Sequence, residues 1–109
     1  MISDDTVDKA LEWLSQNAKK AAKARAERIF LEGYTKHLVA KLARASEASS
    51  VSGKEQEAYA SHEYLEHLEA IRIAVEVDEY MRWQLTNAEA KIEVFRTLQA
   101  NARAQGKVG

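Results

Sequence analysis

The segment His62-Glu63-Tyr64-Leu65-Glu66-His67 carries the residue types that most suggest a metal site. Helical zinc sites use two histidines four residues apart, and helical di-iron sites use a Glu-x-x-His pair. Here the histidines are five residues apart, about 140° around a helix, and position 64 is a tyrosine. Glu63 and His67 could supply a pair of ligands only if another helix completed the site. We therefore expect no metal and no cofactor.

Asp78 stands where an apolar residue is expected. It belongs to a stripe whose steps alternate between three and four residues: Ala60, Tyr64, His67, Ile71, Ala74, Asp78, Met81, Leu85, Ala88, Ile92, Phe95, Gln99 and Ala102. This spacing predicts a helix that keeps one face against another helix. A charge on that face is unfavourable unless it is paired. Asp78 either specifies register or partner, or it pairs with a base of the first helix while Val75 and Val77 pack instead.

Five basic side chains gather in the first half of the chain: Lys19, Lys20, Lys23, Arg25 and Arg28. Clustered cations can bind phosphates, so this cluster is a candidate nucleic-acid contact. However, residues 17–44 carry eight bases and residues 55–79 carry eight acids, so a hairpin would lay opposite charges along each other. No base-reading motif or stacking platform accompanies the cluster. We expect a neutralised face, with nucleic-acid contact as the alternative.

Three aromatic residues, Trp13, Tyr80 and Trp83, lie off the apolar stripes. Exposed aromatic side chains often mark a packing surface between proteins. The alternative is that they wrap around the edge of the molecule. Both interpretations stay open at this point.

Two long helices are expected to position these residues. The first spans about residues 4–45, and its apolar residues follow mainly at steps of four, so the apolar face should drift around the helix: Val7, Leu11, Leu14, Ala18, Ala22, Ala26, Phe30, Tyr34, Leu38 and Leu42. A serine-rich loop at 46–53 follows, and a capping box of Ser52 and Glu55 starts the second helix. That helix should run from about 54 to 105 and stop at Gly106. The fold class is therefore all-α, a single domain formed by an antiparallel two-helix hairpin.

A hairpin of this length leaves apolar residues without an intramolecular partner. Phe95, Leu98 and Ala102 should extend past the start of the first helix. Two helices also enclose little core for the surface they expose. We therefore expect a homodimeric four-helix bundle or docking onto an unidentified protein, with these interface residues: Trp13, Asp78, Trp83, Phe95, Leu98 and Ala102.

Composition narrows the function class. The 109 residues have a net charge of −1, no cysteine and no proline. No apolar run approaches the roughly 20 residues of a membrane span, and the acidic N-terminus is not a signal peptide. We expect a cytoplasmic protein with no membrane partner. No catalytic residue is expected either, because the chain has no nucleophile motif and no glycine-rich phosphate loop.

Two stretches of the second helix, Glu55–Ala60 and Ala88–Asn101, resemble small helical proteins encoded by bacteriophages and prophages. Those proteins are generally of unassigned function and are sometimes found among recombination and replication genes. The resemblance implies a phage or bacterial setting and supplies no catalytic residues. The resulting hypothesis is a non-enzymatic interaction protein: an adaptor, inhibitor or assembly factor. The alternative is a nucleic-acid-associated accessory protein of phage recombination or replication that uses the basic first helix.

Overall fold

The computed structural model describes residues 3–108, which form three helices. They are α1 (Asp4–Ala45), α2 (Val51–Ala60) and α3 (His62–Val108). No strand occurs within the described range. The predicted all-α fold class is thus confirmed.

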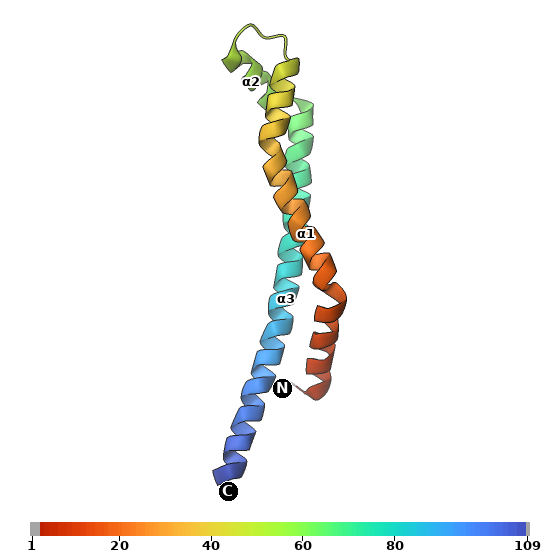
Figure 1. Cartoon of the computed structure of the whole chain (residues 1–109), viewed down its shortest axis with the longest axis vertical. Helices are drawn as coiled ribbons and strands as arrows, with labels where there is room; N and C mark the ends of the chain where they lie inside the picture. Colours follow the sequence, from red (N-terminus) through yellow and green to blue (C-terminus); the bar gives the residue numbers. More distant parts are fainter. Residues whose placement is uncertain (1–2, 109) are drawn as a thin grey trace. The chain divides into compact units, whose positions relative to one another are not determined.

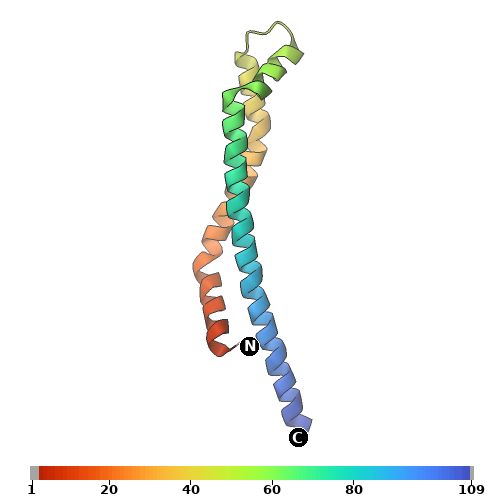
Figure 2. The ribbon, with the colours of Figure 1, turned by 180° about the vertical axis from the view of Figure 1, so that it is seen from behind.

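The chain divides into two compact units. Unit 1 consists of Met1–Ala22 with Tyr80–Gly109, and unit 2 consists of Lys23–Glu79. In unit 2 the segments of α1 and α3 run antiparallel and lie side by side in both views, with α2 joining them at one end (Figures 1 and 2). Unit 2 is therefore a helical hairpin. Unit 1 contains the first part of α1 and the last part of α3.

The covered face of α3 follows the predicted stripe. Every stripe residue from Tyr64 to Phe95 is buried or half-buried, whereas Ala60, Gln99 and Ala102 are exposed. Steps of three and four residues average 3.5, which keeps one face of a helix turned toward its neighbour. The apolar pattern of α3 thus identifies its contact face over about nine turns.

The covered face of α1 differs from the expected one. Its members also alternate by three and four residues: Val7, Ala10, Leu14, Asn17, Ala21, Ala24, Arg28, Leu31, Thr35, Leu38 and Leu42. The predicted drift at steps of four was wrong, because Ala18, Ala22, Ala26 and Phe30 are exposed. Polar Asn17, Arg28 and Thr35 take the positions that those apolar residues were expected to fill. We call the two facing rows, on α1 and α3, the seam.

A break at Ser61 divides the expected second helix into α2 and α3. Ser61 has extended backbone angles, φ −73° and ψ 156°. Its hydroxyl donates to the carbonyl of Ala58 at 2.7 Å and accepts the N–H of Tyr64 at 3.2 Å. One serine therefore closes α2 and caps α3, which a serine does well because its hydroxyl substitutes for a helical backbone partner.

The start of α2 also differs from the predicted capping box. Ser50 is the N-cap, and its hydroxyl accepts the N–H of Gly53 at 2.9 Å. Ser52 lies within the first turn of α2, so it does not cap the helix. At the other end, Gly106 lies inside α3, which extends to Val108. The loop between α1 and α2 is accordingly shorter than the predicted 46–53.

Candidate functional site

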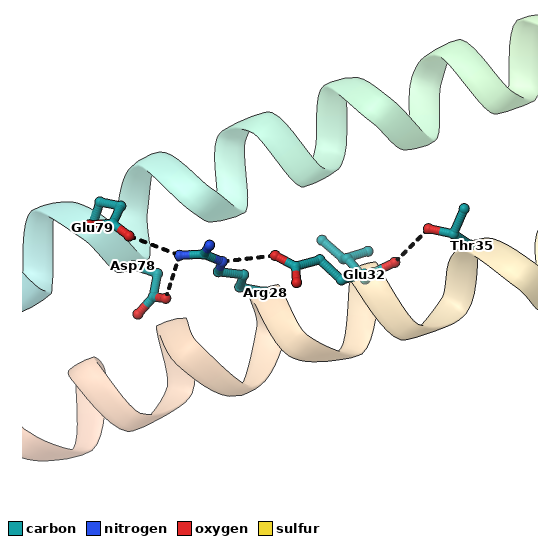
Figure 3. A network of polar contacts seen from close by, with 6 residues as sticks. Arg28, Glu32, Thr35, Asp78 and Glu79 are labelled. Atoms are coloured by element: carbon teal, nitrogen blue, oxygen red, sulfur yellow. Dashed lines mark hydrogen bonds and ion pairs between the residues drawn. The ribbon is translucent and has the colours of Figure 1, made fainter.

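A network of charged side chains crosses the seam of unit 2 (Figure 3). We call Arg28, Glu32, Asp78 and Glu79 the seam cluster. Nη1 of Arg28 donates to Oδ2 of Asp78 at 3.2 Å and to Oε1 of Glu79 at 3.0 Å, while Nε donates to Oε1 of Glu32 at 2.8 Å. Hydrogen bonds to Glu32, Glu79 and Asp78 raise the pKa of Arg28 above its usual range, so the guanidinium stays charged.

Burial makes Asp78 the sensitive member of the seam cluster. The side chain of Asp78 is 4% exposed, whereas that of Arg28 is 28% exposed. A buried carboxylate that loses its cation is strongly destabilising, because nothing compensates for the lost hydration. Of the two interpretations of Asp78, pairing with a base of the first helix is therefore observed. Val75 beside it is half-buried, and Val77 is exposed.

A second polar pair crosses the same seam. Oγ1 of Thr35 and Nε2 of His67 share a hydrogen bond of 2.8 Å, and His67 is 7% exposed. The ring of Tyr34 lies 5.8 Å from the ring of His67 and 5.1 Å from that of His37, measured between centroids. Within the described residues, no three His, Cys, Asp or Glu side chains lie close enough to hold a metal ion.

An apolar groove runs between α1 and α3 in unit 2. Its volume is about 360 Å³, and we call it the unit 2 groove; it is lined by Ala24, Glu27, Leu31, Ala70, Ile73, Ala74 and Val77. Ile73 and Val77 are about half exposed. Phe30, next to Leu31 in sequence, is 64% exposed and stacks on Tyr34. Exposed apolar side chains thus lie in and beside this groove, and a patch of that kind often marks an interaction site.

A more polar groove runs between α1 and α3 in unit 1. It measures about 200 Å³, and we call it the unit 1 groove; its lining is Lys9, Ala10, Trp13, Gln84, Asn87, Ala88 and Lys91. Trp13 is half-buried there. Lys9 also forms an exposed ion pair with Asp5 at 3.2 Å. Trp13, predicted as an interface residue, therefore lies beside lysines and amides rather than in an apolar patch.

The remaining predicted interface residues are not gathered into one site. Trp83 is 70% exposed. Phe95 is half-buried and forms the last covered position of α3, so its assignment to the uncovered end was wrong. Leu98 and Ala102 are exposed, as is every side chain from Arg96 to Gly106. The uncovered end of α3 consequently begins at Arg96.

The structure separates Arg28 from the other members of the predicted basic cluster. Lys19, Lys20, Lys23 and Arg25 are exposed, whereas Arg28 is half-buried and engaged in the seam cluster. Sequence reasoning missed Thr35 as a seam residue. A strict alternation of three and four residues drawn back from Leu38 would have passed through Leu31, Arg28 and Ala24, and this signal was available in the sequence.

None of the helices in the described part of the chain combines the length and the apolar character that crossing a bilayer requires. Comparison with protein-family models, with curated proteins and with solved structures gave no match for the chain. The geometry of the seam and of the two grooves is therefore what the functional conclusion rests on.

Proposed function

We propose that this chain is a non-enzymatic interaction protein, an adaptor, inhibitor or assembly factor, whose first partner is a second copy of itself in a four-helix bundle. One observation carries the proposal. In the described part of the chain the buried apolar residues are Val7 and four alanines, while thirteen large apolar side chains are exposed. Hydrophobic burial is the main favourable contribution to folding, and these thirteen side chains contribute little of it in a single chain.

The accessible surface supports association. The chain exposes 8438 Å² at a mass of 12.3 kDa. Folded monomers of that mass expose about 6,100 Å² by the usual scaling of surface with mass. The difference, about 2,300 Å², exceeds what a standard protein–protein interface buries in total. A partner can therefore bury an interface of standard size, and the chain would still expose as much surface as a folded monomer of its mass.

The unit 2 groove is the surface that a second copy fits. Helical positions seven residues apart share a face, so Lys41 continues the face of the groove on α1, and Glu63 and Glu66 continue it on α3. If two copies pack with their loops at the same end, α1 of each lies on α3 of the other. Lys41 of one copy then lies near Glu63 and Glu66 of the other, which favours this pairing over others.

One residue of the unit 2 groove opposes tight packing. Glu27 brings a carboxylate into a surface that is otherwise apolar, and burying a charge without a close cation is unfavourable. We therefore expect a dimer with a dissociation constant in the range of about 1–10 μM rather than a nanomolar one. The resemblance of Glu55–Ala60 and Ala88–Asn101 to phage-encoded helical proteins supports a phage or prophage setting for this protein.

Sedimentation equilibrium of the full chain over about 1–100 μM tests this proposal. The wild type should approach dimer at the upper concentrations. A double variant, Ile73→Glu with Val77→Glu, should remain a helical monomer throughout, because it places two carboxylates in the apolar contact. Val51→Glu is the matched control, since Val51 is 77% exposed and lies outside the groove. A wild-type chain that stays monomeric at every concentration would refute self-association.

A further inference from the structure

One face of unit 1 carries no carboxylate. Positions seven residues before or after a lining residue of the unit 1 groove lie on the same face of its helix. These positions extend the face of the groove and include Gln16, Lys20, Tyr80, Val94 and Leu98. Unit 1 has six acidic side chains, and all of them fall at other helical positions: Asp4, Asp5, Asp8, Glu12, Glu89 and Glu93. Asp5 lies at the edge of this face, where its carboxylate pairs with Lys9 at 3.2 Å. A chain with 17 acids thus keeps this face free of them.

The groove in this face combines three kinds of side chain that recognise nucleic acid together. Lys9 and Lys91 supply cations from opposite helices, Gln84 and Asn87 supply amides that both donate and accept, and Trp13 supplies a large aromatic ring. Ammonium groups neutralise phosphates, amides pair with the edges of bases, and aromatic rings stack on bases that are not already stacked in a duplex.

We propose that this face binds single-stranded nucleic acid, with a base stacked on Trp13 and the flanking phosphates held by Lys9, Lys91 and Lys20. This activity is separate from the proposed self-association, which uses the unit 2 groove. It also differs from a nucleic-acid contact through Lys19 to Arg28, because the aromatic ring and the amides lie in unit 1. An adaptor with both surfaces would link a strand to a protein assembly.

The size of the groove favours a strand over other anionic ligands. About 200 Å³ is smaller than the 300–1,000 Å³ or so of typical small-molecule pockets, so it suits a single base rather than a complete cofactor. A duplex would hide its base faces from Trp13 and could use only the lysines. The stacking partner therefore has to be an unpaired base.

The chain contains only two tryptophans, Trp13 and Trp83, which makes the stacking directly observable. In Trp83→Phe, Trp13 is the only tryptophan. Titration with an unlabelled oligothymidylate of about 15 nucleotides should quench the fluorescence emission of Trp13. In Trp13→Phe, the exposed Trp83 reports instead, and its emission should stay unchanged. Binding of labelled oligothymidylate, followed by anisotropy, should weaken by about 5- to 100-fold in a further variant, Trp13→Ala, which removes the stacking ring. Far-ultraviolet circular dichroism verifies that each tryptophan variant keeps its helices.

The lysines are tested separately through salt dependence. With three phosphate contacts, the logarithm of the binding constant should fall with the logarithm of salt concentration at a slope near −2, at about −0.7 per contact for a single strand. Lys9→Gln and Lys91→Gln should each reduce that slope by about 0.7. Lys36→Gln, an exposed lysine of unit 2, is the matched control and should leave the slope unchanged.

Three results would overturn the proposal. The first is no quenching of Trp13 in Trp83→Phe at low salt. The second is equal affinity for duplex and single strand, which would mean that charge alone is sensed. The third is quenching by polyglutamate but not by oligothymidylate, which would assign the face to an acidic protein. A monomeric wild type in sedimentation would refute the dimer while leaving this proposal intact, so the two can fail independently.

Discussion

Units 1 and 2 keep their helices together by different means. In unit 2, Arg28 with Asp78 and Thr35 with His67 form polar contacts across the seam. Among the described residues of unit 1, the buried ones are Val7, Ala10 and Ala88, which are small and apolar. Apolar contacts stabilise many alignments of two helices almost equally, whereas a buried polar pair is satisfied in one. We therefore expect the alignment of the hairpin to depend mainly on the polar pairs of unit 2.

The two units also differ in charge, and this suits them to different partners. Unit 1 has eight basic and six acidic side chains, while unit 2 has eight basic and eleven acidic ones. The acids of unit 2 include Glu63 and Glu66, which the proposed dimer would place near Lys41 of the second copy. The modest positive charge of unit 1 is compatible with a phosphate backbone.

The largest effect should come from Arg28→Ala, which leaves the carboxylate of Asp78 buried without its cation. We expect the melting temperature to fall by about 10 °C. Asp78→Asn should lower it less, because Arg28 retains Glu32 and Glu79 and is partly exposed. Thermal unfolding followed by circular dichroism measures both changes.

Arg72→Ala is the control for Arg28→Ala. Arg72 pairs with Glu69 and Glu76 on the exposed face of α3, and exposed pairs contribute little, about 0–1 kcal/mol. If Arg72→Ala lowered the melting temperature as much as Arg28→Ala does, the special role assigned to the seam cluster would be wrong.

A change of intermediate size in the melting temperature is expected at Thr35 and His67, and its sign should differ between the single and the double variant. Thr35→Val alone leaves the ring nitrogen of His67 buried without its partner, so the melting temperature should fall by about 5 °C. Thr35→Val combined with His67→Leu removes both polar groups and should restore the wild-type value or exceed it. A double variant less stable than the single variant would contradict this expectation. It would show that the hydrogen bond between Thr35 and His67 stabilises unit 2 more than apolar side chains at the same positions do.

The smallest effects should come from two glycines of unit 2. A Cβ at Gly33 would meet no atom within 4 Å, so Gly33→Ala should stabilise the helix by up to about 1 kcal/mol. A Cβ at Gly53 would lie 3.0 Å from Oγ of Ser50 and 3.3 Å from Cβ of Ala48, so Gly53→Ala should disturb the N-cap of α2. Urea unfolding of the two variants should therefore give free-energy changes of opposite sign.

Most of the fold could be predicted from the sequence because α3 fills its contact face with apolar residues at regular steps. The face of α1 could not be predicted in the same way. Apolar character alone selects Ala26 and Phe30, whereas the seam uses Arg28 and Thr35, whose partners lie on the other helix. The alternation of three and four residues drawn back from Leu38 marks these positions, but it does not say which residue of α3 will pair with each polar side chain.

The candidate surfaces were predicted less well than the fold. Asp78 and Trp13 were identified because a charge on an apolar stripe and an aromatic off it are both unusual. The two grooves were not predicted, because each is lined by side chains of both α1 and α3. Which side chains lie opposite each other depends on the alignment of the two helices along the seam. The break at Ser61 was missed because a serine within a helical pattern gives no sign that its hydroxyl will replace the backbone bonds at that point.

The capped ends of α2 have a consequence for how the molecule can be divided. A ten-residue helix is marginal by itself in water, and only Ala58 of α2 is buried. The amide hydrogens of α2 should therefore exchange with solvent well before those of the seam, as expected of a segment that opens by itself. Cleaving the chain between Ser49 and Ser50 would leave α1 and α3 on separate peptides without removing a seam contact. The cleaved hairpin would thus become a complementary pair of peptides. The dissociation constant for their recombination would measure the strength and selectivity of the seam.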